Sequence, residues 1–369
     1  MNGFHPPQSA PAINAARLAD TVLAPRHATP PIRSATTFAG KPGSEFLPAR
    51  LVALMQQAIA ATGLDLTGLT VLTEAATGAY AVTPVIAAMA GAEEVYAVAR
   101  PSRHGSVGVA HASVEALAQA AGVAGRISLL AHVPEDRLGA IDIVTNSGHL
   151  RPLGARLIKR LPPEAVVALM FEAWEFRPED IALAACRSRG IPVVGVNERH
   201  PSIDVFSFLG PLAAALLRES GVALAGSRVA VICDNPFGLY ILQGLADADS
   251  FAWLFPDTSA MFAADWDAVV VALQPSSSMR IDAHEARRIA AMAPEACIAQ
   301  VWGDIDRAAF AEAGGTVWPL QAPRPGHMGI LLSALGPEPI VRLQTGGLRA
   351  AEWIRRGGAA LPGGFAQMV

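Results

Sequence analysis

The sequence alternates short runs of β-branched and other apolar residues with longer helical stretches, and this alternation restricts the fold more than any other feature. The short runs predict strands, because Val, Ile and aromatic side chains suit a buried, pleated surface. Strands alternating with helices are typical of a parallel sheet covered by helices. The runs occupy residues 69–73, 94–99, 126–131, 140–145, 165–171 and 191–196, and then 227–233, 250–255, 267–273, 296–302 and 315–320.

A long helical segment, "DVFSFLGPLAAALLRESG", separates the two sets of strands. We therefore predict an α/β protein of two Rossmann-like, doubly wound parallel-sheet domains joined by an interdomain helix, which suits a chain of 369 residues. The predicted parts are an irregular N-terminal arm (1–45), a first domain of the substrate-binding or catalytic type (46–205), the interdomain helix (206–225) and a second domain of the dinucleotide-binding type (226–330). Residues 331–369 are predicted to return as a helix and complete the first domain.

The composition argues against several classes of partner. The net charge is −4 and 16% of residues are charged, so nothing predicts the basic face that binds nucleic acid or an anionic membrane. The apolar runs stop short of the roughly 18 residues that a membrane span needs. The N-terminus lacks the basic start and apolar run of a secretory signal, so we expect a cytoplasmic protein. Its three scattered cysteines predict buried thiols rather than disulfides.

Polar residues gather just past the predicted strands. In open parallel sheets, ligands bind outside the carboxyl ends of the strands. Aromatic residues are interleaved with the polar ones, as they would be in a pocket, and we expect the edges of the two domains to face each other across a cleft. The residues predicted to line this substrate cleft are Tyr80, His149, Asn197 and Trp302. The alternative is that these loops are polar only because exposed backbone must be solvated.

The second half of the chain resembles a known family. "ALAGSRVAVICDNPFG", "WDAVVVALQPSSSMR" and "APRPGHMG" are similar in spacing and apolar pattern to motifs of the D-2-hydroxyacid dehydrogenases. The resemblance covers residues 178–329. It implies a two-domain Rossmann-like fold, NAD or NADP as cofactor, and an oxidoreductase acting on a small molecule.

The cofactor motif of that family is altered in this chain. Its first turn is Gly-x-Gly-x-x-Gly, in which the first two glycines serve the tight turn and the diphosphate, and the third allows the helix to pack on the strand. The matching positions here are Cys233, Asn235 and Gly238, so only the packing glycine is retained. The Asn235 side chain fills space that a diphosphate needs, and Asp234 would repel it. Asp257 ends the next strand, where an acid would bind a ribose or would simply be a turn residue.

The catalytic positions are altered as well. The resemblance places the acid/base histidine at His327, whose role would be to move the hydroxyl proton. The alternative for His327 is a loop histidine bonded to nearby backbone. The arginine that holds the substrate carboxylate falls at Trp302, which cannot form a bidentate ion pair. In the interval where the family has its glutamate, only Glu312 is found, within a predicted helix. We therefore do not expect a conventional 2-hydroxyacid dehydrogenase.

The first half carries a pattern of the same kind. "TVLTEAATGAYAVTPVIAAMAGAEEVYAVARPSRHGS" resembles, in spacing, the first strand, turn and second strand of dinucleotide-binding proteins and of S-adenosylmethionine-dependent methyltransferases. Thr73, Ala75 and Gly78 occupy its three glycine positions. Arg100, which follows the second strand with Ser102 and Arg103, belongs to the kind of cluster that receives the 2′-phosphate of NADP.

Acidic residues follow two neighbouring strands of the first half. "MFEAWEF" places Glu172 and Glu175 after one strand, and "NERHP" places Glu198 and His200 after the next. Adjacent strands lie ~4.8 Å apart, so these groups could meet, with or without His149, as a divalent-metal site or an acid/base pair. The alternative is helix capping and surface hydrogen bonds. The catalytic candidates are His327, Glu172, Glu175 and His200, and we assign no metal.

Three functions follow from these patterns. The first is a small-molecule biosynthetic enzyme, NAD(P)-dependent and with a divergent cofactor site formed by Cys233, Asp234, Asn235, Gly238 and Asp257. The second is a binding or scaffolding protein that kept the dehydrogenase fold and lost the cofactor. The third is a methyltransferase-like first domain. For all three we expect a small-molecule ligand, no nucleic-acid or membrane partner, and a chain that could form a homodimer.

Overall fold

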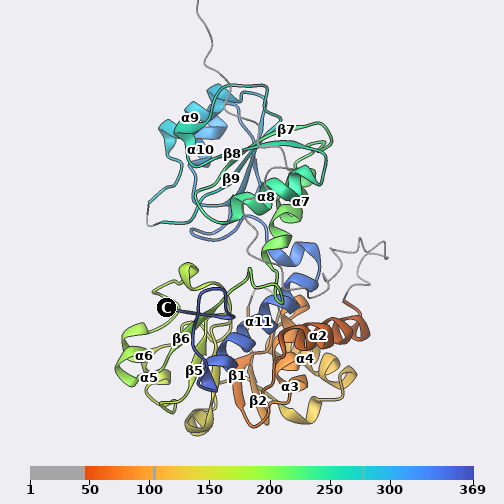
Figure 1. Cartoon of the computed structure of the whole chain (residues 1–369), viewed down its shortest axis with the longest axis vertical. Coiled ribbons are helices and arrows are strands. Elements are labelled where there is room, and N and C mark those ends of the chain that lie inside the picture. The colour runs from red at the N-terminus through yellow and green to blue at the C-terminus, as the bar shows by residue number, and fades with distance from the viewer. Residues whose placement is uncertain (1–45, 103–104, 277) are drawn as a thin grey trace, which may run out of the picture. The chain divides into compact units, whose positions relative to one another are not determined.

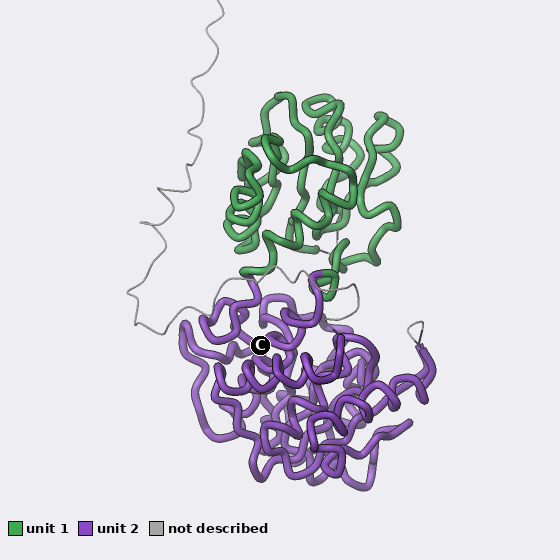
Figure 2. Tube along the Cα trace, turned by 90° about the vertical axis from the view of Figure 1, so that its right-hand side faces the viewer, with its two compact units in different colours: residues 1–39, 207–334 green, residues 40–206, 335–369 purple. Residues whose placement is uncertain are grey.

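The chain folds into two compact units, each built on a largely parallel sheet (Figures 1 and 2). The computed structural model describes residues 46–102, 105–276 and 278–369, so the predicted N-terminal arm lies outside the described residues. Of the described residues, unit 1 contains 207–334, and unit 2 contains 46–206 and 335–369. The predicted fold class, α/β with Rossmann-like parallel sheets, is confirmed. None of the described helices is long and apolar enough to cross a membrane.

Unit 2 is built on a seven-stranded sheet with the order β12-β6-β5-β4-β1-β2-β3. Its strands are β1 (Thr70–Glu74), β2 (Glu94–Val98), β3 (Ile127–Leu130), β4 (Ile143–Thr145), β5 (Val166–Ala168), β6 (Val193–Val196) and β12 (Ala366–Met368). All run parallel except β12, which pairs antiparallel with β6. The order β3-β2-β1-β4-β5-β6 is that of dinucleotide-binding sheets, and it reverses direction between β1 and β4. Ligands of such sheets bind at that point, outside the carboxyl ends of the strands.

Helices cover both faces of this sheet. Successive strand residues point to opposite faces, and residues on both faces are therefore buried. They are α2 (Pro48–Thr62), α3 (Val82–Met89), α4 (Val107–Ala120), α5 (Ala155–Ile158), α6 (Leu183–Arg189) and α11 (Glu338–Arg355), with the short 3-10 helices η2 (Gly78–Ala81), η3 (Ala124–Arg126), η4 (Glu135–Ala140) and η5 (Ala173–Glu175). On one face, Leu72, Val144 and Val167 form a core with Ile158 of α5 and Cys186 of α6. Helices α3 and α11 contact the strands from the other side, and α2 packs on both of them.

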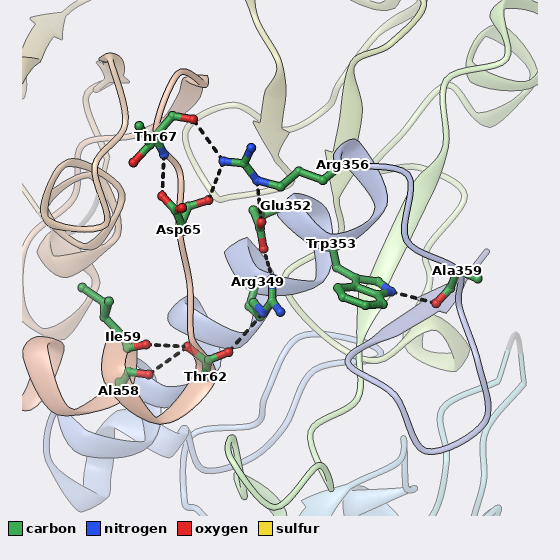
Figure 3. A network of polar contacts seen from close by, with 10 residues as sticks. All are labelled: Ala58, Ile59, Thr62, Asp65, Thr67, Arg349, Glu352, Trp353, Arg356 and Ala359. Atoms are coloured by element: carbon green, nitrogen blue, oxygen red, sulfur yellow. Dashed lines mark hydrogen bonds and ion pairs between the residues drawn. The ribbon is translucent and has the colours of Figure 1, made fainter.

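Arginine side chains fasten the C-terminal helix α11 to the rest of unit 2 (Figure 3). Arg349 donates to the carbonyl of Thr62 at the end of α2, at 3.1 Å, and Arg356 donates to the carbonyl of Thr67, at 3.0 Å. Glu352, which is buried, lies between the two arginines and accepts hydrogen bonds from both. A helix from the far end of the chain is thus part of the same folded unit as α2 and β1.

The prediction that residues 331–369 return as helix to the first domain is wrong for the last part of that segment. Helix α11 ends at Arg355, and residues 366–368 form β12 at the edge of the sheet. The sequence between them contains Gly357 and Gly363, both with positive φ, and Pro362. These residues favour turns over helix, and they let the chain reverse to pair with β6.

Unit 1 has a five-stranded parallel sheet with the order β11-β10-β9-β7-β8. Its elements are α7 (Leu209–Glu219), β7 (Arg228–Ile232), α8 (Phe237–Ala246), β8 (Phe251–Phe255), η7 (Thr258–Ala260), β9 (Ala268–Ala272), α9 (Ala283–Met292), β10 (Cys297–Trp302), α10 (Arg307–Glu312) and β11 (Val317–Trp318). Two 3-10 helices, η6 (Phe206–Phe208) and η8 (Leu332–Leu335), lie where the chain passes between the units. Strand order here reverses between β7 and β9, which makes that crevice the expected ligand position of unit 1.

Residues 206–225, predicted as an interdomain helix, contain α7, which belongs to unit 1 and packs on α8. The two helices approach closely at Gly210 and Gly244, where a Cβ on either residue would lie within 2.6 Å of backbone atoms of the other helix. On the opposite face of the sheet, α9 and α10 pack against β7 and β9 through residues such as Ile289 and Phe310.

The close packing of α11 on the sheet of unit 2 gives a test of this architecture. A Cβ on Gly347 would lie 2.7 Å from the Met170 Sδ and 3.3 Å from its Cα, just past β5. Gly347→Val should therefore lower the free energy of unfolding by about 1–3 kcal/mol through overpacking. Gly108→Val, in the exposed first turn of α4, is the matched control and should change it by less than about 0.5 kcal/mol. Urea denaturation measures both, and equal effects would contradict this packing.

Candidate active site

The first turn of unit 1, after β7, is closed by its own side chains. Asn235 accepts a hydrogen bond from the Phe237 N–H, at 3.0 Å, and donates to the Ala272 carbonyl at the end of β9, at 2.7 Å. The Asp234 carboxylate accepts from the Gln274 N–H, at 2.8 Å, and pairs with Arg280, at 2.6 Å. Because β7 and β9 flank the switch point, these bonds span the crevice in which a dinucleotide would lie.

The other predicted residues of this turn have structural roles. Gly238 serves packing, since a Cβ there would lie 2.9 Å from a methyl carbon of Leu254 on β8. Cys233 is buried, and burial raises the pKa of its thiol to about 11. A thiol of that pKa is protonated at neutral pH and is a poor nucleophile.

Three further candidates in unit 1 are also engaged locally. The Asp257 carboxylate caps η7 by accepting from the backbone N–H groups two and three residues on, and the Ser259 hydroxyl, followed by these backbone bonds, lowers its pKa. Trp302 is buried and stacks on Phe237 with ring centroids 5.1 Å apart. The exposed His327 lies 2.9 Å, through Nδ1, from the carbonyl of Pro325. With Asn235 and Asp234 bridging the crevice, the residues of unit 1 do not fit the diphosphate of NAD or NADP.

In unit 2, three glutamates lie together past the carboxyl ends of β5 and β6, two of them buried and Glu175 partly exposed. Glu172 is fully buried and Glu198 is 6% exposed, and the Glu198 N–H donates to Glu172 Oε1 at 3.2 Å. The segment that carries Glu172 and Glu175 lies directly on β6. This is allowed by Gly195, where a Cβ would lie only 2.4 Å from the backbone nitrogen of Ala173. The glutamate trio is therefore a product of close backbone packing.

Burial and mutual repulsion raise the pKa of two members of this trio, Glu175 and Glu198. Burial, and then the charge of Glu172, raise the pKa of Glu175 to about 7, and nearby Arg177 opposes the shift. Burial, followed by Glu175 and Glu172, raises the pKa of Glu198 well above its ordinary value. Glu172 itself is bound by Arg199, at 3.5 Å, and by the indole N–H of Trp174. A carboxyl group with a pKa near 7 can both give and take a proton at neutral pH.

The metal alternative for these acids finds no support in the described part of the chain. Nowhere among the described residues are three His, Cys, Asp or Glu side chains grouped so that they could hold a metal ion. His200, the predicted partner of the trio, stacks on Phe365 with ring centroids 3.9 Å apart. Burial and nearby Arg349 lower its pKa, which favours a neutral imidazole. Asn197 donates to the carbonyl of Gly364, at 2.9 Å, and so holds the same C-terminal segment.

A second polar cluster lies past β1 and β4, at the switch point of unit 2. Glu74 accepts a hydrogen bond from the backbone N–H of His149, at 2.9 Å. Burial, and then the charge of Glu74, raise the pKa of the phenol of Tyr80. Arg151 donates to the backbone carbonyl of Asn146 through Nε, at 3.1 Å, and through Nη2, at 2.7 Å. Tyr80 and His149, predicted for the substrate cleft, thus meet around an acid that the sequence analysis did not select.

The sequence did not point to Glu74, Arg151 or Arg177, and it placed Glu198 at this sheet edge without assigning it a catalytic role. Glu74 ends its strand, and Arg151 and Glu198 follow theirs within the motifs that supplied His149 and His200. The signal was present, because ionisable residues at the carboxyl edge of a parallel sheet lie where ligands bind. What the sequence could not show is which of these neighbours turn toward one another.

The described fold is shared with solved proteins. A dipicolinate synthase chain from Bacillus subtilis matches with a TM-score of 0.52 and 14% identity, covering 80% of this chain and 99% of that one. The corresponding dipicolinate synthase chain from Bacillus halodurans matches with a TM-score of 0.50 and 12% identity, covering 76% and 96%. An NAD-complexed D-isomer-specific 2-hydroxyacid dehydrogenase from Lactobacillus delbrueckii ssp. bulgaricus has a TM-score of 0.49 and 12% identity, covering 79% and 98%.

No protein-family model and no curated protein matches the sequence. At identities this low, the likeness to the dipicolinate synthase chains is one of fold. The predicted two-part Rossmann-like fold is therefore shared with these chains, and membership of the D-2-hydroxyacid dehydrogenase family remains a prediction from the sequence.

The protons held by the glutamate trio predict how stability depends on pH. The folded protein keeps a proton on Glu175 that the unfolded chain releases above its ordinary pKa of 4.5, so stability should fall as pH rises from there to about 7. Glu175→Gln should reduce that fall by about 1–3 kcal/mol. Urea denaturation across this pH range measures the effect. Glu179→Gln, at an exposed position, is the control, and parallel pH profiles for all three proteins would contradict the prediction.

Proposed function

We propose that this protein is a small-molecule enzyme that transfers a proton to or from its substrate at the carboxyl edge of the unit 2 sheet, with Glu175 as the acid/base. The observation that carries the proposal is the position of Glu175. It lies against the buried Glu172 and Glu198 and still retains some exposure to solvent. Acid/base catalysis uses carboxyl groups whose pKa is strongly perturbed. Keeping such groups together lowers the stability of a fold, so their presence at a sheet edge indicates a functional use.

The three glutamates divide the work in this proposal. Glu172 carries a charge that Arg199 and Trp174 hold in place, and this charge sets the proton affinity of Glu175. Glu198 is buried, and burial, followed by the charges of Glu175 and Glu172, raises its pKa. Glu175 is then the member that can exchange a proton with a substrate. His327, predicted as acid/base from the family resemblance, is bonded to a local carbonyl in unit 1 and has no role in this proposal.

The fold is in keeping with such an enzyme. Dipicolinate synthase, one of whose chains shares it, is by its name a biosynthetic enzyme for a small molecule. The proposal retains the predicted class of small-molecule biosynthetic enzyme and moves its chemistry to unit 2. A protein that kept only the scaffold would have no need for these three acids together at a ligand-binding edge.

A nicotinamide-dependent oxidoreductase is the second candidate, with the nucleotide bound by unit 2. The strand order β3-β2-β1-β4-β5-β6 favours it, because this is the order of dinucleotide-binding sheets. At the first turn, Gly78 has φ +60° and no atom within 4 Å of a Cβ built on it, which leaves room for a phosphate. Arg100 follows β2, where it would meet the 2′-phosphate of NADP. When bound, the nucleotide would supply or accept a hydride, and Glu175 would handle the accompanying proton.

The proton-transfer function is tested by exchange of hydrogen with solvent. The protein is incubated in D₂O with a panel of amino, 2-oxo and 2-hydroxy acids, chosen because Arg177 lies beside Glu175, and deuterium at the carbon next to the carboxylate is followed by NMR. Glu175→Gln should reduce exchange by about a hundredfold or more. Glu179→Gln should leave it unchanged. No exchange with any acid of the panel, or equal rates for the two variants, would refute the proposal.

The second candidate is tested by calorimetric titration with NADH and NADPH. NADPH should bind saturably. Arg100→Ala should weaken NADPH binding by about tenfold and leave NADH binding unchanged, because only NADPH carries the 2′-phosphate. Asn235→Ala, in the closed turn of unit 1, should leave both affinities as they are. Loss of nucleotide binding in the Asn235→Ala variant would place the nucleotide in unit 1. If the native protein bound neither nucleotide, this second candidate function would be refuted.

A further inference from the structure

Two arginines flank one aromatic ring beside the glutamate trio. The Cζ of Arg151 lies 5.5 Å, and that of Arg177 6.0 Å, from the ring centroid of Phe171. Phe171 immediately precedes Glu172, and Arg177 is close enough to Glu175 to lower its pKa. The trio and the arginine pair therefore form one continuous site at the edge of the sheet of unit 2.

Part of the hydrogen-bonding capacity of this arginine pair is left for a ligand. Arg151 commits Nε and Nη2 to Asn146, and its Nε lies 3.5 Å from Asp180, so Nη1 is the end that remains. For Arg177, the described residues offer the face of Phe171 and no carboxylate at ion-pair distance. A half-buried guanidinium resting on an aromatic ring, with no acid bound to its fork, is suited to bind a carboxylate.

The glutamate trio, by contrast, has few positively charged neighbours. Among the described residues, the one cation at ion-pair distance from the trio is Arg199, and it binds Glu172. Glu175 and Glu198 repel each other and Glu172, with only Arg177 nearby to relieve Glu175. A positively charged ligand group placed between Glu175 and Glu198 would remove this repulsion.

The charges around the site indicate which kind of ligand would supply both an acid for Arg177 and a cation for the glutamate trio. Glu74 and Asp180 already compensate Arg151, so a ligand with only a carboxylate would add negative charge beside three glutamates. A ligand with only an amine would leave Arg177 without an acid. A buried donor also remains, since the Nδ2 of Asn146 is enclosed and has no hydrogen-bond partner among the described residues.

We infer that this site binds a small zwitterion, an amino acid, with its carboxylate on Arg177 and the Nη1 of Arg151 and its ammonium on Glu175 and Glu198. The inference rests on the proposed function in that both use Glu175. It adds the substrate class, and it places the carbon between the two charged groups next to the acid/base. Tyr80, whose pKa is raised by burial and by Glu74 and lowered by Arg151, belongs to the polar cluster on the Arg151 side of the site.

Isothermal titration calorimetry at neutral pH tests the inference with the standard amino acids as probes. At least one should bind saturably. The analogue of that amino acid without its amino group, and the analogue without its carboxylate, should each bind about tenfold more weakly or worse. Titrations in buffers of different ionisation enthalpy should show proton release on binding, because an ammonium group draws the proton off Glu175.

Arg177→Gln should weaken binding of the same amino acid by about tenfold or more. Arg187→Gln is the matched control, because it removes the same charge from an exposed position of unit 2 and should change the affinity by less than about twofold. The inference would be overturned by binding of no amino acid, by equal binding of the deamino analogue, or by equal effects of the two variants.

These outcomes are separable from failure of the proposed function, because binding is measured without turnover. Amino-acid binding that depends on Arg177, with no exchange of the carbon-bound hydrogen, would refute proton transfer and leave the site intact. Exchange that depends on Glu175 but acts on an acid without an amino group, with no amino acid bound, would refute the zwitterion site and leave proton transfer intact.

Discussion

The electrostatic repulsion among Glu172, Glu175 and Glu198 is the interaction on which the proposed acid/base chemistry depends. Carboxylates avoid burial unless they are paired or protonated, so keeping three together requires a scaffold that holds them there. Gly195 supplies part of it by letting the segment after β5 lie on β6. Met170, with φ +71°, turns the chain between β5 and the glutamates, and α11 packs on that turn through Gly347. Several non-local contacts thus converge on one cluster of charge.

The carboxyl edges of the two sheets differ in how far their polar side chains are bonded within the protein. In unit 1, Asp234 and Asn235 use side chains to bridge the strands that flank the switch point, and the crevice is filled by these bonds. In unit 2, the corresponding edge holds acids and arginines whose bonds within the protein are incomplete. The chemistry that the family resemblance assigns to the second half of the chain therefore has its best physical basis in the first half.

Much of the fold was predictable from the sequence, because strand and helix periodicities are local. The parallel strands and the two-part α/β architecture followed from them, whereas the packing role of Gly238 came from the resemblance to the Gly-x-Gly-x-x-Gly turn. The strand β12 was not predictable, since its pairing with β6 depends on a turn and on contacts with residues far away in the chain. In the site, Glu172 and Glu175 could be chosen from their position after a strand. Glu198 could be placed at the same edge for the same reason, but the role of Arg177 could not be predicted, because it depends on the direction of a side chain across neighbouring loops.

NMR titration of the glutamate side-chain carboxyl carbons would measure the raised pKa, about 7, that the cluster gives to Glu175. With ¹³C-labelled glutamate in the native protein, one carboxyl resonance should titrate near pH 7 and be absent in Glu175→Gln. If every glutamate resonance titrated at about pH 4 to 5, the range of unperturbed carboxyl groups, the account would be contradicted.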